Sequence, residues 1–291
     1  MGPRLTPVVK PSSRPQDFLI RLSIHAGLTE SLLVEFLRLE TLRTDRHRAV
    51  VGVSGGIDSA VVLALAVKAL GPQSVVGAVL PYGTNRPSDA RDAQQVLDLF
   101  GVRRVQRDIS PMVDAYFSGC SDADQLRGGN KMARERMSIL YDLSACVRAL
   151  VLGTSKKTEL LLGYGTLHGD LACALNPLGD LYKTQVRQLA RHLGLPSRVL
   201  RKAPSAGFYP GQADEAEIGF SYTRLDRLLY FLVDLRGSQK NAVRAGFPRN
   251  MVHRVSEMIR LSQYKRRMPL IAKVSQRTIG VDFRYPRDWG T

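Results

Sequence analysis

The chain has 291 residues, 44% of them hydrophobic, which is enough to bury a substantial core in one large domain or one domain with extensions. Lys and Arg outnumber Asp and Glu by 42 to 26, and the net charge of +16 favours an anionic partner, either a nucleic acid or a small polyanionic substrate. No uninterrupted apolar run reaches about 18 residues, so the sequence predicts no membrane-spanning helix and no membrane partner.

The chain begins with a basic, Pro-rich stretch that lacks the apolar centre of a signal peptide. We expect residues 1–16 to form a flexible arm and residues 17–291 to form a single domain. The three cysteines (Cys120, Cys146 and Cys173) lie far apart and form no CxxC pair. This spacing favours a reduced, cytoplasmic protein over one held together by disulfides.

Strands and helices alternate through the first half of the chain. After one or two leading helices before residue 45, short β-branched runs predict strands at 48–54, 74–82, 103–109 and 150–155. Apolar residues at helical spacing predict helices at 57–71, 88–101 and 130–149. The alternation indicates an α/β fold with a parallel sheet covered by helices on both faces. Beyond about residue 180 the pattern is mostly helical, so the N- and C-terminal portions are both predicted to be helical.

The turn after the first strand reads SGGIDS, from Ser54 to Ser59. Ligands of open parallel sheets bind beyond the carboxyl ends of the strands. Gly55 and Gly56 allow a sharp turn and a close approach to a ligand, and the following helix directs its N–H groups toward the same place. The turn therefore suits a polyphosphate, except that the negative charge of Asp58 would repel one. A Mg2+ ion between Asp58 and the phosphates would remove this conflict.

The Walker pattern and a strand-linked GxGxxG are both absent, and the SGGIDS turn instead resembles the pyrophosphate loop of the N-type ATP pyrophosphatases. An ordinary tight turn with an N-terminal aspartate is the alternative interpretation. Four further segments narrow the resemblance to the ammonia-dependent NAD synthetases: LVLGTSKKTELLLGYGTLHGD, NPLGDLYKTQVRQLARHLGLP, PSAGFYPGQADEAEIGFSY and YKRRMP. These segments and the loop together extend from about residue 48 to residue 269.

The resemblance implies an adenine nucleotide hydrolase-like fold and a homodimer. It also implies ATP- and Mg2+-dependent amidation of deamido-NAD by ammonia through an acyl-adenylate, with release of AMP and pyrophosphate. No glutaminase domain precedes the matching region, so we expect free ammonia to supply the nitrogen.

The same resemblance implies roles for individual residues. Asp58 and Glu159 are expected to bind Mg2+, and Asp58 and Lys183 are the expected catalytic residues. Deamido-NAD is expected to contact Arg134, Asp170 and Lys265. The residues expected to bind ATP are Ser54, Gly55, Gly56, Ile57, Asp58, Ser59, Thr154, Lys183 and Ser205.

The acceptor side departs from the common family pattern at five positions. The family usually has polar or charged residues where this chain has Leu167, Ala174, Gly207, Tyr264 and Met132. Each missing charged hydrogen bond could weaken binding of deamido-NAD by about 1–3 kcal/mol. Compensation from other positions is the alternative, with His168, Lys131, Lys156 and Lys157 as the candidates.

Two other functions stay open at the level of sequence. One is an adenylating amide ligase of the same fold that acts on a different carboxylate. The other, which the sequence supports less, is a tRNA-modifying ATP pyrophosphatase; the cysteines have no thiolation pattern, and no appended RNA-binding motif is evident. Nucleic acid is therefore an unexpected partner. The acidic segment 214–219 is either a lid over the adenylate or an ordinary acidic first turn of a helix.

Overall fold

A computed structural model describes residues 22–44, 46–83, 87–120, 124–209 and 211–283, so the predicted arm at 1–16 lies outside the described residues. Its centre is a four-stranded parallel sheet in the order β3-β2-β1-β4. Val50 of β1 is in register with Val76 of β2 and with Val151 of β4. The strands are β1 (Arg48–Gly52), β2 (Val75–Val79), β3 (Arg103–Gln106) and β4 (Ala149–Leu152). The edge strand β3 exposes Arg103 and Arg104.

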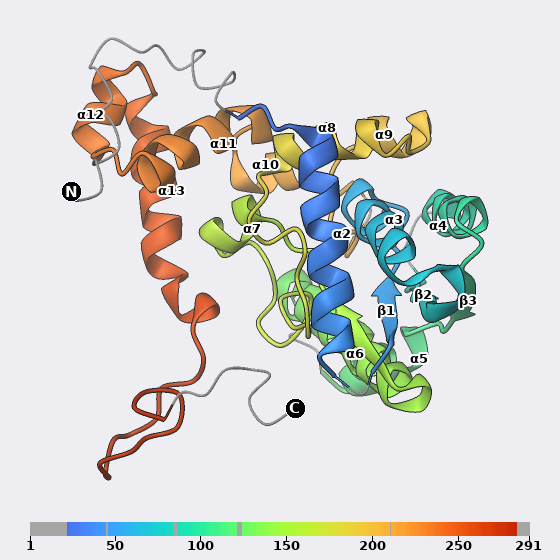
Figure 1. Ribbon diagram of the computed structural model, residues 1–291. Coiled ribbons are helices and arrows are strands. Elements are labelled where there is room, and N and C mark those ends of the chain that lie inside the picture. The colour runs from blue at the N-terminus through green and yellow to red at the C-terminus, as the bar shows by residue number, and fades with distance from the viewer. Residues whose placement is uncertain (1–21, 45, 84–86, 121–123, 210, 284–291) are drawn as a thin grey trace, which may run out of the picture.

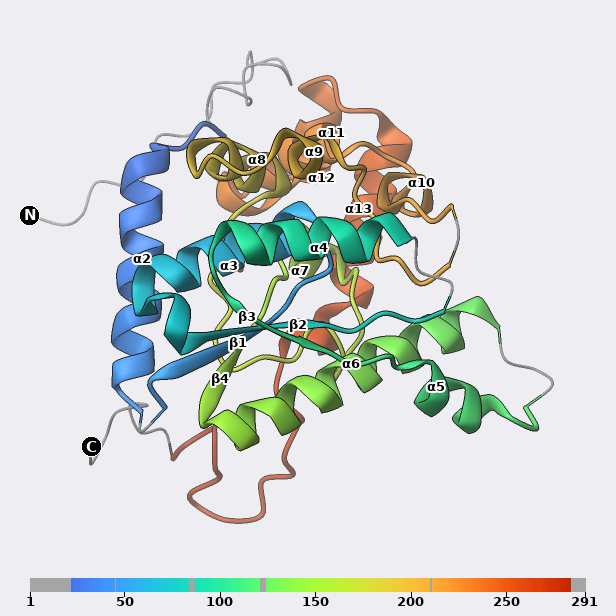
Figure 2. The same ribbon diagram turned by 90° about the vertical axis from the view of Figure 1, so that its right-hand side faces the viewer.

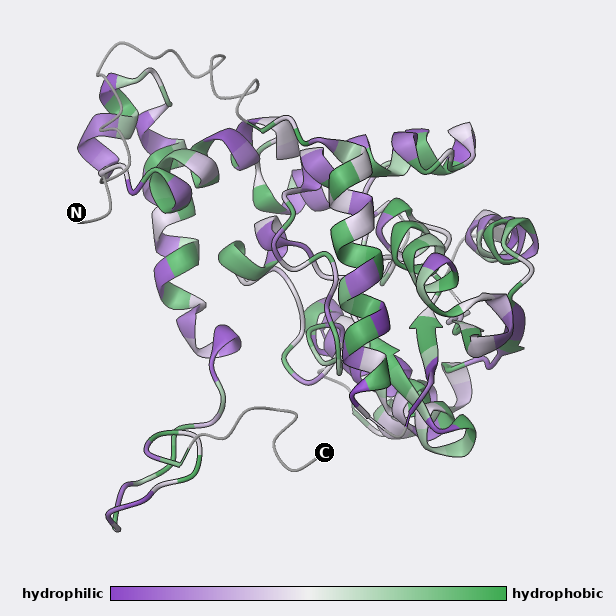
Figure 3. Ribbon diagram, in the orientation of Figure 1, coloured by the Kyte–Doolittle hydropathy of each residue, from purple (hydrophilic) through white to green (hydrophobic). Residues whose placement is uncertain are grey.

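Helices cover both faces of this sheet (Figures 1 and 2). One apolar cluster joins the first face to α3 (Ile57–Leu70), α4 (Pro87–Leu99), α8 (Lys183–His192) and part of α2 (Ala26–Leu42). A second cluster joins the opposite face to α5 (Ser110–Phe117) and α6 (Gln125–Val147). In Figure 3 the most hydrophobic ribbon includes β1, which both clusters bury. The predicted α/β class with a doubly covered parallel sheet is confirmed.

The C-terminal half forms a separate helical cluster beside the sheet. Its core includes Tyr182, Tyr222, Leu225 and Val255. The elements after β4 are α7 (Lys157–Leu162), α8, α9 (Ser197–Arg201), α10 (Asp214–Ile218), α11 (Tyr222–Leu229), the π-helical turn η3 (Tyr230–Asp234), α12 (Gln239–Arg244), α13 (Arg249–Leu261) and the 3-10 turn η4 (Gln263–Arg266). A further 3-10 turn, η2 (Pro72–Ser74), precedes β2. No helix of the described residues is long and apolar enough to cross a membrane.

The start of a helix differs from the sequence prediction where a side-chain cap, rather than the spacing of apolar residues, determines it. One leading helix forms in the described region before β1, and α6 begins at Gln125, five residues earlier than predicted. The early start has a cap, because the Asp124 carboxylate accepts a hydrogen bond from the backbone N–H of Arg127 at 2.7 Å. Helix α5 was not predicted. Beyond η4 the chain extends away from the helices, and Met268, Leu270 and Val274 are almost fully exposed (Figure 1).

Candidate active site

A cavity of about 1090 Å3 opens at the carboxyl ends of the strands. Its wall includes the turn after β1, the segment after β4, the N-terminal half of α6 and the segment between α9 and α10. Lys265, from the C-terminal helical half, also lines it. The cavity therefore lies where ligands of open parallel sheets bind, and it joins the two halves of the molecule.

The turn from Ser54 to Ser59 is held in shape by its own hydroxyl groups. Ser59 Oγ donates to the Gly56 carbonyl at 3.1 Å and accepts from the Ser54 N–H at 3.3 Å. Ser54 Oγ accepts from the Gly56 N–H at 3.3 Å. Gly55 has φ +72°, and a Cβ atom there would lie 2.6 Å from the Asp89 carbonyl oxygen. The turn can therefore form only with glycine at this position, and it places the N-terminus of α3 at the cavity.

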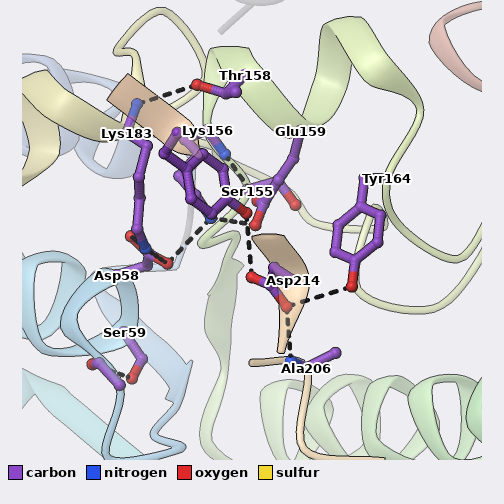
Figure 4. A network of polar contacts seen from close by, with 12 residues as sticks. Asp58, Ser59, Ser155, Lys156, Thr158, Glu159, Tyr164, Lys183, Ala206 and Asp214 are labelled. Carbon is purple, nitrogen blue, oxygen red and sulfur yellow. Dashed lines mark hydrogen bonds and ion pairs between the residues drawn. The ribbon is translucent and has the colours of Figure 1, made fainter. Parts of the chain in front are cut away.

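Asp58, in the first turn of α3, meets two lysines from distant parts of the chain (Figure 4). Lys183 Nζ, at the start of α8, donates to both Asp58 oxygens at 2.9 and 2.7 Å. Lys156 Nζ donates to Asp58 Oδ2 at 3.0 Å and also to the Glu159 carboxylate. The structure thus brings three predicted site residues together (Asp58, Glu159 and Lys183), with Lys156 bridging the two carboxylates.

The four charged groups differ in their access to the cavity. The Asp58 and Glu159 side chains are 22% and 16% exposed, whereas Lys156 and Lys183 are each only 1% exposed as whole residues. Both ammonium groups lie near the ring of Tyr222: its centroid is 5.8 Å from Lys156 Nζ and 5.6 Å from Lys183 Nζ. The carboxylates therefore keep an open side, while protein closes over the ammonium groups.

This proximity shifts the pKa values in opposite directions. Burial raises the pKa of the Asp58 carboxyl, but Lys156 and Lys183 outweigh burial and lower that pKa to about 2. Burial also raises the pKa of Glu159, and there the attraction of Lys156 does not fully compensate. For Lys156, burial opposes the charged form, yet Asp58 and Glu159 together raise its pKa. Asp58 and Lys156 are consequently both ionised at neutral pH.

A buried carboxylate outside the cavity wall aligns the two helices that carry this cluster. Asp226 of α11 accepts from Thr158 Oγ1 of α7 and from the Thr184 N–H of α8, each at 2.7 Å. Thr158 Oγ1 in turn accepts from the Lys183 N–H at 3.0 Å. Because Thr158 precedes Glu159 and Thr184 follows Lys183, Asp226 fixes the N-termini of α7 and α8 relative to each other.

The other residues expected at the nucleotide site also line the cavity: Ser54, Gly56, Ile57, Ser59, Thr154 and Ser205. Gly55 is the residue of the turn that does not line the cavity, but its carbonyl oxygen accepts from Lys202 Nζ at 3.2 Å. Ser205 is exposed, and its Oγ accepts from the Gly207 N–H at 3.1 Å.

Two of the three residues expected on the acceptor side line the cavity. Asp170 accepts from the Thr166 N–H at 2.8 Å, and Lys265 Nζ donates to the carbonyl oxygens of Gly163 and Gly165 at 2.8 and 2.7 Å. Arg134 does not line the cavity; it is exposed, and its Nε donates to the Leu167 carbonyl at 3.2 Å.

Sequence reasoning did not single out Arg136 or Lys202, two cationic residues of the cavity wall. Arg136, two positions after Arg134, faces the cavity, and its guanidinium lies 5.9 Å from the ring centre of Phe208. Helical phase could have found it, because Arg136 lies one turn from the buried residues Met132 and Leu140 on the same face of α6. Lys156 was considered only as a possible compensating cation, and no pattern in SKKTE distinguishes it from a solvated lysine.

The unusual acceptor-side residues occupy different environments. Met132 is buried in the apolar cluster between α6 and the sheet, whereas Gly207 and Tyr264 line the cavity. Leu167 and Ala174 do not line it. Of the four proposed compensating residues, Lys156 alone is in the cavity wall; Lys131 pairs with Glu135 at 2.5 Å, and Lys157 pairs with Asp234 at 2.8 Å.

Within the acidic segment 214–219, Asp214–Ile218 form the short helix α10, with Asp214 and Glu217 in the cavity wall. Asp214 is buried and accepts from Tyr222 Oη at 3.0 Å, Tyr164 Oη at 3.2 Å and the Ala206 N–H at 3.1 Å (Figure 4). Asp214 thereby ties α10 to two tyrosines and to the preceding segment. Among the described residues, no group of three or more His, Cys, Asp or Glu side chains could hold a metal ion by itself.

The family model and the relatives found by comparison with known proteins agree with each other. A family model described as NAD synthase matches residues 30–269. A relative named NH(3)-dependent NAD(+) synthetase, from Trichlorobacter lovleyi, is 52% identical over 270 residues, which cover 93% of this chain and 99% of the relative. A relative of the same name from Chlorobium phaeobacteroides is 50% identical over 268 residues, covering 92% of this chain and 97% of the relative.

Two solved structures resemble the whole arrangement. An NH3-dependent NAD synthetase from Campylobacter jejuni, in complex with the nitrate ion, has a TM-score of 0.75 and 31% identity, covering 86% of this chain and 100% of that chain. An NMN synthetase from Francisella tularensis has a TM-score of 0.77 and 31% identity, covering 86% of this chain and 99% of that chain.

Proposed function

This chain belongs to the NAD synthase family, and we propose that it joins ammonia to the nicotinate carboxyl of deamido-NAD, forming NAD with release of AMP and pyrophosphate. The observation that carries the proposal is the cluster of Asp58, Glu159, Lys156 and Lys183 beside the SGGIDS turn, in the wall of a cavity of about 1090 Å3. Oriented N–H groups, two carboxylates and two cations suit the triphosphate of ATP.

The residues present fit Mg2+. The two carboxylates converge closely enough for one cation, the Lys156 ammonium, to bond with both. Mg2+ is commonly held by one or two carboxylates together with substrate phosphates and water, so Asp58 and Glu159 would hold it. When bound, the ion would neutralise phosphate charge and help to stabilise the leaving pyrophosphate.

Ammonia cannot displace oxide from a carboxylate, so the acceptor has to be activated first. Attack of the nicotinate carboxylate on the α-phosphate of ATP forms an acyl-adenylate and releases pyrophosphate. Ammonia then adds to the acyl carbon, and AMP leaves. This chemistry requires positioning and charge stabilisation more than proton transfer. The turn and the first N–H groups of α3 would orient the phosphates, and the Lys183 ammonium would stabilise charge developing on them.

The acceptor would occupy the part of the cavity lined by residues from α6, the segment 163–170 and η4. Lys265 and Arg136 supply positive charge there, and Asp170 supplies hydrogen-bond acceptors. Burial lowers the pKa of Arg136 to about 10, which still leaves the guanidinium protonated at neutral pH. We assign to Arg136 the contact with the anionic acceptor that the sequence predicted for Arg134.

The direct test supplies purified protein with ATP, Mg2+, ammonium and deamido-NAD. We expect equal amounts of NAD, AMP and pyrophosphate, with product formation dependent on all four additions. AMP release that needs deamido-NAD but forms no NAD would contradict the proposal, as would NAD formation without ATP.

A second candidate acceptor is nicotinate mononucleotide, whose amide is NMN. The observation that favours it is the similarity to the NMN synthetase from Francisella tularensis. Parallel assays with the mononucleotide and the dinucleotide acids separate the two candidates through the ratio of their kcat/KM values. Either acceptor uses the same activation of a pyridine carboxylate, so the assignment of the nucleotide site does not depend on this result.

We further propose a homodimer and a cytoplasmic location. The exposed apolar side chains of α5, α6 and the segment after η4 (Met112, Tyr116, Leu126, Leu270 and Val274) are the surfaces that a second copy could cover. A cytoplasmic location agrees with three cysteines that are free and with the requirement for ATP. Sedimentation of the purified protein tests the dimer.

A further inference from the structure

Lys156 occupies an unusual position for a lysine of a nucleotide site. Its ammonium group does not point freely into the cavity but lies between the Asp58 and Glu159 carboxylates, bonded to both. Lys183 differs from Lys156 because its ammonium group forms its ion pair with the Asp58 carboxylate and does not bridge to Glu159. Lys156 also precedes Glu159 by three residues on the same turn, so the contact is built into the start of α7.

The charges of the cluster balance in this arrangement. Two carboxylates face two ammonium groups, and the lysine side chains are almost fully buried. A divalent cation that binds between the two carboxylates, at the oxygens now bonded to the Lys156 ammonium, would repel or displace that ammonium group. Addition of the ion alone would leave an excess positive charge in a poorly solvated cluster, which is unfavourable.

The phosphates of ATP would remove that excess. They bring negative charge to the turn beside Asp58, so the metal ion and the displaced ammonium group would both have anionic partners. We propose that Lys156 acts as an internal counter-ion that keeps divalent metal out of the free protein, so that Mg2+ enters only together with the nucleotide. This inference rests on the proposed metal site at Asp58 and Glu159 and concerns the order and strength of metal binding, not the identity of the acceptor.

The test measures Mn2+ binding to the full chain without turnover, by electron paramagnetic resonance of the free ion. In the absence of nucleotide we expect weak binding to the wild-type protein. Lys156→Met removes the ammonium but keeps an unbranched side chain, and we expect it to strengthen Mn2+ binding by at least about tenfold, because the two carboxylates lose their internal cation.

The matched control is Lys157→Met, at the next position of the same helix. Lys157 pairs with Asp234 and Asp180 on the side away from the cluster, so this substitution removes an equal charge without touching Asp58 or Glu159. We expect its Mn2+ affinity to equal that of the wild-type protein. Adding Asp58→Asn to Lys156→Met should abolish the gain, which would show that the new affinity arises at this site.

The change in unfolding temperature on adding Mn2+ is a second measurement. It compares each variant with itself, so a loss of stability caused by the substitution does not affect the comparison. We expect Lys156→Met to unfold at a lower temperature than wild type in EDTA and to recover in Mn2+, whereas the wild-type temperature should change little. Equal or weaker Mn2+ affinity in Lys156→Met would overturn the inference, and so would an unfolding temperature that Mn2+ does not raise. Absence of NAD formation would reject the proposed function without changing either of these measurements.

Discussion

Asp58 supports two buried cations at once, which makes it the residue whose charge the site can least lose. Its carboxylate bonds to the ammonium groups of Lys156 and Lys183, at 2.7 to 3.0 Å. In Asp58→Asn the shape is kept but the charge is removed, so one lysine loses its ion pair and the proposed metal ion loses a ligand.

We expect Asp58→Asn to lower kcat by at least about 100-fold and to reduce the free energy of unfolding by about 3 kcal/mol. AMP release and urea unfolding measure the two effects. Asp98→Asn, on the exposed side of α4, is the control and should change neither quantity. Retention of wild-type turnover by Asp58→Asn would mean that this carboxylate is not part of the catalytic site.

The lowered pKa of Asp58 also predicts a pH dependence of stability. The pKa is about 2 in the folded protein and 3.8 as a reference for the unfolded chain. The stabilisation is therefore fully present above pH 3.8 and is lost as the pH falls through the folded value. We expect the free-energy difference between wild type and Asp58→Asn to shrink between about pH 4 and about pH 2. Urea unfolding at several pH values checks this, and a constant difference would contradict the assigned ion pairs.

At the scale of elements, helix α3 has a positive-φ glycine at each end. Gly55 precedes the helix with φ +72°, and Gly71 follows it with φ +79°. A Cβ atom at Gly55 would collide with the Asp89 carbonyl and the Ala93 N–H group, whereas a Cβ at Gly71 meets nothing within 4 Å. The two positions therefore share a backbone penalty and differ in the space around them.

We expect Gly71→Ala to cost about 1–3 kcal/mol of stability and to leave kcat unchanged, because the penalty is local. Gly55→Ala should cost more and should also raise the KM for ATP, because the collision displaces the turn that faces the phosphates. Unfolding curves and steady-state kinetics of both variants measure these effects. Equal behaviour of the two variants would show that the turn tolerates displacement.

At the scale of the whole molecule, the net charge of +16 should draw anionic substrates toward the cavity. We expect kcat/KM for ATP and the acceptor to fall several-fold between about 0.05 M and about 0.5 M NaCl, while kcat changes little, because salt screens approach more than chemistry. Initial rates measured over this range at a constant Mg2+ concentration, and repeated with KCl in place of NaCl, check this. Independence of kcat/KM from salt would mean that the surplus charge does not steer substrates.

Much of the fold was predictable because its signals are local. The β-branched runs marked all four strands, and the sequence from Ser54 to Ser59 identified the turn and the start of α3. The cluster at Asp58 was harder, because Lys156 and Lys183 approach it from 98 and 125 residues away. Resemblance suggested Lys183, but the position of Lys156 depends on how α7 meets the sheet. The choice of Arg136 over Arg134 was within reach of the sequence, because Arg136 lies one helical turn from the buried Met132 and Leu140.

The order of the strands leaves β3 at one border of the sheet, where backbone groups could pair with a strand of another molecule. Arg103 and Arg104 are exposed along this border, and Arg104 contacts Gln94 and Gln106. Cationic side chains on a border strand repel an identical strand brought alongside. The surplus of basic residues that gives the chain its positive charge therefore also disfavours aggregation through the exposed edge of β3.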